Sequence, residues 1–246
     1  MILLELVPRE LEQTASEAVT LLDQFKQLSG INVPDVRRLT NRSYVVAERL
    51  LDQKIEVVPH IKSIDNSLEK TVEIVCRLQQ KGLRQALIVT GDPPPDLSCE
   101  TYPITPMQVV ESVKERCPDL KLYCALDPYR QSFKKELQYC RNKLRAGADG
   151  FFTQPFFDPD LARIYIEQLE DCDVFVGISP VISERSYHYW ITRNHAIFPK
   201  RFQLTLEGNV EIGREIMAQA RHAHKSIYLM PIKVPAEPYL AALLAE

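Results

Sequence analysis

The amino-acid sequence predicts a single (βα)₈ barrel, and three observations lead to this fold class. Eight short apolar runs recur along the 246 residues at fairly regular intervals. Segments with apolar residues at helical spacing lie between them, and such alternation indicates a parallel sheet with crossover helices. Eight units in about 250 residues favour a closed barrel over an open sheet. No linker, low-complexity tract or charge block divides the chain, so we expect one domain over residues 1–246.

The expected strands are short apolar runs, many of them bounded by turn residues. They are Ile2–Leu6, Gly30–Val33, Ile55–His60, Ala86–Thr90, Leu120–Ala125, Gly150–Thr153, Val174–Ile178 and Ser226–Met230. The expected helices are Leu11–Leu28, Ser43–Gln53, Ser67–Lys81, Pro106–Arg116, Ser132–Ala146 and Pro159–Leu169. Asp158, which Pro159 follows, is a predicted N-cap. The longest interval, Ser179–Lys225, has room for two helices around Phe202–Leu206.

Composition excludes several classes of protein. The net charge is −3 and the basic residues are scattered, which argues against a nucleic-acid binder. No apolar stretch approaches the ~20 residues of a membrane span, and the apolar start lacks the form of a signal peptide. Six cysteines occur without a CxxC spacing, so we expect free thiols in a reducing, cytoplasmic compartment. No Rossmann GxGxxG fingerprint and no zinc-like ligand spacing are present, and His222 and His224 do not share a helix face.

Polar side chains fall within or just after several predicted strands, where a barrel opens its active-site mouth. They are Glu5, His60, Asp92 and Gln154, with Asp92 in the segment Thr90-Gly91-Asp92-Pro93. A Glu in an apolar strand pays a desolvation cost unless it is paired or used. Burial would raise its pKa and make it a general acid near neutral pH.

Each of these residues also has a structural interpretation. Glu5 could lie on an exposed edge of a frayed terminus, and His60 could be a hydrogen-bonded core histidine. Asp92 could be a turn residue, and Gln154 could bond a neighbouring loop. The local patterns leave these alternatives open.

Four segments together resemble one family. They are the strand Leu-Glu-Leu-x-Pro, Pro59-His60, the segment Thr-Gly-Asp-Pro-Pro at residues 90–94, and AGADGFFTQPFFD at residues 146–158. With Gly177-Ile178-Ser179-Pro180, their order is similar to that of the methylenetetrahydrofolate reductases. The similarity runs from Leu3 to Pro180, and Thr-Gln-x-Phe-Phe-Asp is its most specific part.

The resemblance implies a (βα)₈ barrel that binds FAD without a Rossmann domain and acts in one-carbon metabolism and methionine biosynthesis. Such an enzyme passes a hydride from NAD(P)H to flavin and then to methylenetetrahydrofolate, giving the 5-methyl form. It implies that Glu5 protonates folate during ring opening and that Asp92, a second catalytic residue, lies near both flavin and pterin. Gln154 would contact folate or nicotinamide, and His60, Thr90, Gly91 and Lys143 would be flavin-contacting positions.

The chain departs from the family pattern in three places. Residues 31–37 replace a Thr-Tyr-Gly-Ala type loop that helps to hold flavin and nicotinamide. Thr90 stands where an Arg often precedes Gly-Asp, which removes one phosphate partner. The loop Asp127–Gln131 is shortened, and Arg130 is the cation that could compensate on the flavin pyrophosphate.

Three functional hypotheses follow. The first is a flavoenzyme that reduces methylenetetrahydrofolate or a related pterin. The second is a non-redox folate-binding protein, such as a methyltransferase component or a subunit that meets an electron-donating partner. A homo-oligomer is compatible with both. The third is a barrel lyase or aldolase, for which Lys62 is the only lysine near a predicted strand end.

Overall fold

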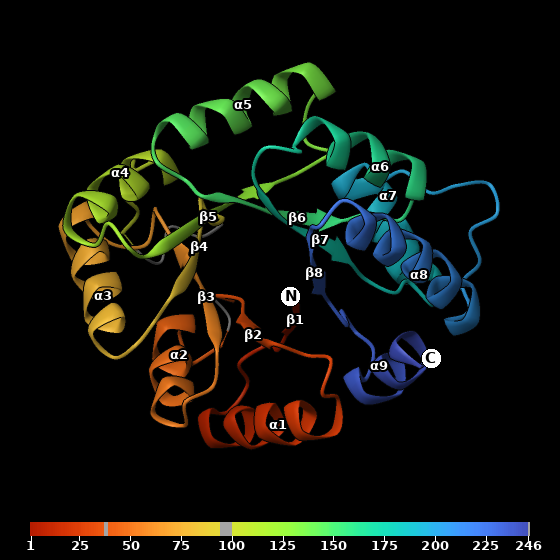
Figure 1. The fold of residues 1–246 in the computed structure, drawn as a ribbon, viewed down its shortest axis with the longest axis horizontal. Helices are drawn as coiled ribbons and strands as arrows, with labels where there is room; N and C mark the ends of the chain where they lie inside the picture. The colour runs from red at the N-terminus through yellow and green to blue at the C-terminus, as the bar shows by residue number, and fades with distance from the viewer. Residues whose placement is uncertain (37–38, 94–99, 246) are drawn as a thin grey trace.

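The structure is a computed structural model that describes residues 1–36, 39–93 and 100–245. Its strands close into a parallel barrel in chain order, with β8 paired to β1. The strands are β1 (Ile2–Glu5), β2 (Gly30–Val33), β3 (Val57–Lys62), β4 (Gln85–Val89), β5 (Lys121–Leu126), β6 (Gly150–Pro155), β7 (Asp173–Ile178) and β8 (Ser226–Leu229). Figure 1 shows the helices arranged around this sheet, with the N-terminus near the centre. The predicted (βα)₈ barrel is confirmed.

Helices follow the strands and cover the outer face of the barrel. They are α1 (Leu11–Gln24), α2 (Ser43–Asp52), α3 (Leu68–Gln80), α4 (Pro106–Arg116), α5 (Phe133–Arg145), α6 (Pro159–Gln168), α7 (Glu184–Asn194), α8 (Leu206–His222) and α9 (Ala236–Leu244). The two helices expected in the long interval are α7 and α8. Asp158 caps α6, since its side chain accepts the backbone N–H groups of Asp160 and Leu161, as predicted.

The structure corrects several predicted boundaries. Helix α1 ends at Gln24 rather than at Leu28, because Phe25 and Leu28 turn the chain back so that β2 can begin beside β1. Strand β3 continues past His60 to Lys62, and β6 continues past Thr153 to Pro155. Helix α9 was not predicted from the sequence.

Two apolar layers hold the barrel. The larger one lies between strands and helices, whereas a smaller cluster fills the barrel interior. The interior cluster contains Leu3, Val58, Leu87, Tyr123, Phe152, Phe175, Tyr228 and Met230. Since side chains alternate along a strand, residues two positions further on from Leu3 and Val58 also face the interior, at the carboxyl end. These residues are Glu5 and His60.

Strand β6 carries an irregularity at the carboxyl end of the barrel. The pairing with β7 shifts between Phe152 and Pro155, and the hydroxyl of Thr153 accepts the backbone N–H of Gly177 at 2.8 Å. A Cβ on Gly177 would lie 2.6 Å from the carbonyl oxygen of Thr153 and 2.6 Å from Met230 Cε. Gly177 therefore allows this bulge to form, and the bulge shapes the strand that carries Gln154.

One buried side-chain amide anchors the long connection between β7 and β8. Asn209 in α8 accepts the N–H of Val181 at 2.8 Å and donates to the carbonyl oxygens of Val181, Gln203 and Thr205. The loop above β7 is thereby tied to the start of α8.

Candidate active site

A chain of four hydrogen-bonded side chains crosses the carboxyl end of the barrel interior. The hydroxyl of Tyr228 lies in a short contact with Glu5 Oε2 and 3.1 Å from Asn32 Oδ1. His60 Nε2 lies 2.5 Å from the same Asn32 oxygen. Glu5, Asn32, His60 and Tyr228 come from β1, β2, β3 and β8, so closure of the barrel between β8 and β1 is what brings them together.

Burial sets the charge of the two titratable members at the ends of this chain. It raises the pKa of Glu5 from 4.5 to about 7, although the hydrogen bond from Tyr228 acts in the opposite direction. Burial lowers the pKa of His60 from 6.5 to about 4, with Lys62 adding to the effect and Asp35 opposing it. Near neutral pH, Glu5 can therefore hold or release a proton, whereas His60 is a neutral imidazole.

Asn32 carries an unsatisfied donor. The residue is fully buried, and its Nδ2 has no hydrogen-bond partner among the described residues. A buried amide donor without a partner costs about 1–3 kcal/mol. An orphaned donor beside a carboxyl with a raised pKa fits a place where a ligand supplies the acceptor.

A buried ion cluster lies where β2 and β3 run out. Asp35 Oδ2 accepts Arg42 Nε at 2.9 Å, and Lys62 Nζ lies 3.2 Å from Asp35 Oδ1. Asp65 Oδ2 is 2.5 Å from Arg42 Nη2 and 3.9 Å from Lys62 Nζ. Both carboxylates are thus shared between the two cations, and the cluster stiffens the loops above His60. Asp35 belongs to the segment where the sequence departs from the family, residues 31–37, and Arg37 of that segment lies outside the described residues.

The predicted residues Thr90, Gly91 and Asp92 follow β4 at the same end of the barrel. Thr90 and Asp92 are exposed. Gly91 has φ +83°, and a Cβ there would lie 2.8 Å from Cδ of Lys62. This loop therefore rests on the Lys62 stem, and Gly91 permits that contact. The rest of the proline run, Pro94 and Pro95, lies outside the described residues, as does Cys99.

Gln154 is exposed on β6, at the bulge opposite Gly177. The structure thus places Glu5, His60, Asp92 and Gln154 at the carboxyl ends of β1, β3, β4 and β6. Glu5 and His60 are joined through Tyr228 and Asn32.

Arg130 and Lys143, the two cations expected to contact the flavin cofactor, have different surroundings. Arg130 is half-exposed and donates to the buried carboxylate of Glu136 at 2.9 Å. It also lines a groove of about 370 Å³ with Gln131, Lys135, Gln138, Tyr139 and Asn142. Lys143 is only 3% exposed, donates to the carbonyl oxygen of Ala125 at 2.5 Å and lies 4.0 Å from the centre of the Tyr139 ring. Between the two, the geometry favours Arg130 as a contact for an anionic group.

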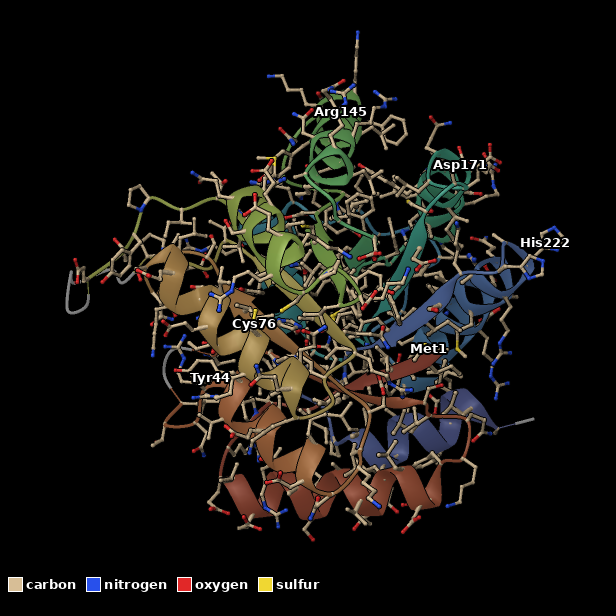
Figure 2. The ribbon with its side chains drawn as sticks, turned by 60° about the vertical axis from the view of Figure 1, so that its left-hand side comes forward. Met1, Tyr44, Cys76, Arg145, Asp171 and His222 are labelled. Atoms are coloured by element: carbon tan, nitrogen blue, oxygen red, sulfur yellow. The ribbon has the colours of Figure 1, made fainter. Side chains whose placement is uncertain are left out.

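Over residues 1–36, 39–93 and 100–245, no group of three His, Cys, Asp or Glu side chains could hold a metal ion. Figure 2 shows His222 at the outer edge of the molecule, where α8 ends. Within the same ranges, no helix has the length and apolar character needed to cross a membrane. The described cysteines are all free, as expected.

Sequence reasoning missed Asn32 and Tyr228, as well as the ion cluster around Asp35. Asn32 stands in the apolar run Gly-Ile-Asn-Val-Pro, and Tyr228 in Ser-Ile-Tyr-Leu-Met. A polar atom inside a buried strand was the available signal, and it was used for Glu5 but not for these two residues.

Comparison with known proteins gives a consistent result. Residues 9–218 match the family described as methylenetetrahydrofolate reductase. A probable methylenetetrahydrofolate reductase (NADPH) of Caenorhabditis elegans is 23% identical over 192 residues, which cover 73% of this chain and 29% of that protein. The 5,10-methylenetetrahydrofolate reductase of Salmonella typhimurium is 22% identical over 206 residues, which cover 81% of this chain and 70% of that protein. For the enzyme of Escherichia coli the identity is 23% over 179 residues, or 70% and 60% of the two chains. The matched part therefore spans between 29% and 70% of these relatives' length.

Solved structures share the architecture. A 2,3-dimethylmalate lyase superposes with a TM-score of 0.62 over 99% of this chain and 78% of its own, at 12% identity. An oxaloacetate acetylhydrolase gives a TM-score of 0.61 over 98% of this chain and 77% of its own, at 11% identity. At such identities the likeness concerns the fold alone.

Proposed function

Because the chain belongs to the methylenetetrahydrofolate reductase family, we propose that it is a flavin-dependent oxidoreductase that reduces 5,10-methylenetetrahydrofolate, or a related pterin, to the 5-methyl form. The observation that carries this proposal is the Glu5 carboxyl. It lies at the carboxyl end of the barrel with a pKa raised to about 7. Opening the imidazolidine ring requires a proton at nitrogen, and a carboxyl with this pKa is suited to deliver it near neutral pH.

The polar residues around Glu5 suit the edge of a pterin, which presents both donors and acceptors. Asn32 Nδ2 offers an unused donor, and Gln154 offers an exposed amide with both kinds of group. Asp92 provides a carboxylate at the end of β4 that can accept from amino and ring N–H groups. We assign substrate binding to Gln154 and Asp92, and a catalytic role to Glu5 and Asp92.

The residues present also fit FAD. The groove beside α5 is lined by Arg130 and Lys135, which are cations suited to the pyrophosphate, and by the ring of Tyr139. His60, Thr90, Gly91 and Asp92 would border the flavin ring. Lys143 would support the groove beside α5 indirectly, because its ammonium group contacts the Ala125 carbonyl and the Tyr139 ring. When bound, FAD would supply the hydride transfer, with NAD(P)H as the donor.

A flavin titration tests the cofactor assignment. We expect purified protein to be yellow, or to bind added FAD with quenched flavin fluorescence and a raised melting temperature. Arg130→Gln should weaken FAD binding about 10-fold, the scale of one charge-assisted contact. Arg145→Gln changes an exposed cation at the end of the same helix and is the control. A colourless protein whose melting is unaffected by excess FAD would refute the flavin assignment.

Stopped-flow kinetics test the role of Glu5. Gln retains the size and hydrogen-bonding capacity of Glu but cannot donate an acidic proton. Glu5→Gln should slow the folate half-reaction by about 10²–10⁴-fold and leave flavin reduction nearly intact. Equal slowing of both half-reactions would contradict the general-acid assignment.

The second candidate is a non-redox folate-binding protein or a subunit that receives electrons from a partner. It is favoured by the altered segment after β2, where the Asp35 ion cluster stands in place of the loop expected to hold nicotinamide. Folate binding without FAD binding would select it. A Schiff-base lyase is disfavoured, because that chemistry needs a lysine amine free to attack a carbonyl carbon, and the Lys62 amine is paired with Asp35 and Asp65.

Location and assembly complete the proposal. The free thiols are in keeping with a reducing compartment, and we propose the cytoplasm. Folate is the proposed small-molecule partner, with a homo-oligomer or an electron-donating subunit as the protein partner.

A further inference from the structure

The Tyr228 hydroxyl has more acceptors than protons. It contacts Glu5 Oε2 and also lies 3.1 Å from Asn32 Oδ1. A phenol carries one proton, so it can donate to only one of these two oxygens at a time. Burial and the nearby Glu5 carboxyl raise the pKa of Tyr228 well above its usual value, which keeps the phenol protonated in both situations.

When Glu5 is protonated, every contact in the chain can be satisfied. Glu5 donates to the Tyr228 oxygen, Tyr228 donates to Asn32 Oδ1, and His60 Nε2–H donates to the same oxygen. Asn32 Oδ1 has two lone pairs and accepts both donors. The distances between these atoms are thus compatible with the acid form of Glu5 when His60 carries its proton on Nε2.

When Glu5 is ionised, the hydrogen bond between Glu5 and Tyr228 must reverse its direction. The carboxylate needs a donor, and the Tyr228 hydroxyl is the one in contact with it. Rotation of its O–H bond toward Glu5 gives a charge-assisted hydrogen bond and removes one donor from Asn32. No proton leaves Tyr228 in this step.

We propose that Tyr228 is a positioning residue that turns its hydroxyl from Asn32 to Glu5 as Glu5 gives its proton to the substrate nitrogen. This inference rests on the proposed function for the transfer itself. The O–H bond of Glu5 breaks, the new N–H bond forms on the substrate, and the negative charge left on Glu5 is met by the Tyr228 hydroxyl. Because that hydrogen bond to the carboxylate strengthens as the proton leaves, it favours the transition state over the ground state.

Few other described side chains near Glu5 could donate a hydrogen bond to its carboxylate. Tyr228 on β8 contacts Glu5, and Asn32 on β2 is the second hydrogen-bond partner of the Tyr228 hydroxyl. From β3, His60 is hydrogen-bonded to Asn32, and the charges of Asp35 and Lys62 act on His60. Among the described residues, Tyr228 is thus the side chain that is hydrogen-bonded to the Glu5 carboxyl.

The test is a titration of the Glu5 carboxyl by isotope-edited infrared spectroscopy in the ligand-free protein. In Tyr228→Phe the ionised form loses its donor, so the midpoint should rise by about one pH unit or more. In Asn32→Leu the hydroxyl loses its alternative acceptor and stays with Glu5, so the midpoint should fall. Tyr123→Phe, in the same barrel interior but with its hydroxyl 3.4 Å from Asp173, is the control and should leave the midpoint unchanged.

Opposite shifts in Tyr228→Phe and Asn32→Leu support the proposal. Shifts in the same direction, or no shift in Tyr228→Phe, overturn it, because a purely structural contact gives no reason for opposite signs. The folate half-reaction of Tyr228→Phe should also slow by about 10–100-fold, with Tyr123→Phe close to the unsubstituted protein. The titration needs no folate, so it decides the hydroxyl switch even if the protein proves to act on another substrate.

Discussion

Replacing Glu5 by Gln should change the way folding stability depends on pH. In the folded protein the pKa of Glu5 is raised from 4.5 to about 7. Between these values the folded state binds a proton that the unfolded chain releases, so stability falls as pH rises from 4.5 to 7 and then levels off. A shift of this size corresponds to about 3 kcal/mol, at about 1.4 kcal/mol per pKa unit.

Gln cannot ionise, and its amide can donate to the Tyr228 oxygen as the protonated carboxyl does. The stability of Glu5→Gln should therefore not fall as pH rises from 4.5 to 7. Relative to the unsubstituted protein, its free energy of unfolding should increase by about 2–3 kcal/mol between pH 5 and pH 8. The opposite dependence of His60, whose lowered pKa costs stability as pH falls from 6.5 to 4, is present in both proteins and cancels in the difference.

Urea denaturation at half-unit steps from pH 5 to pH 8 measures this difference. Glu17→Gln, an exposed substitution in α1, is the matched control and should show no such trend. A Glu5→Gln difference that stays constant across this range would refute the argument that Glu5 is held in a desolvated site. A gain in stability combined with lost folate reduction would show that the site keeps a costly carboxyl for its chemistry.

Three further substitutions test the framework of the site. Gln154→Ala should weaken folate binding by about 10-fold and flavin binding by less, as measured by titration of each ligand. Folate binding as tight as in the unsubstituted protein would exclude this contact. Gly177→Ala should destabilise the protein by about 1–3 kcal/mol in urea, because its Cβ would meet the Thr153 carbonyl at 2.6 Å; an unchanged midpoint would mean that the bulge relaxes freely. Asn209→Ala should cost about 2–4 kcal/mol, because it leaves the Val181 N–H and several carbonyl groups unsatisfied; an increase in protease sensitivity between β7 and α8 should accompany the loss.

The order and type of the elements could be predicted because local patterns carry them. Apolar runs such as Phe151–Phe152 and the capping pair Asp158-Pro159 encode strand and helix without reference to the rest of the chain. Boundaries were less certain, since tertiary contacts decide where an element stops. Helix α1 ends early because Phe25 and Leu28 are buried where the chain returns to the sheet.

The sequence alone also determined which residues to suspect. Glu5, His60, Asp92 and Gln154 stand out as polar groups near strand ends, and the family resemblance assigns them roles. A parallel barrel then places the carboxyl ends of all its strands at one end of the molecule. The prediction of a shared location follows from topology and needs no side-chain detail.

Only the tertiary structure decided what surrounds those residues. Tyr228 lies 223 residues from Glu5 in the chain and 196 from Asn32, and they meet because β8 pairs with β1 and β1 with β2. The pKa of Glu5 depends on burial by several strands at once, which no local pattern encodes. Likewise, Lys143 looks like a free cation in the sequence, yet packing of α5 on β5 turns its ammonium group toward a backbone carbonyl.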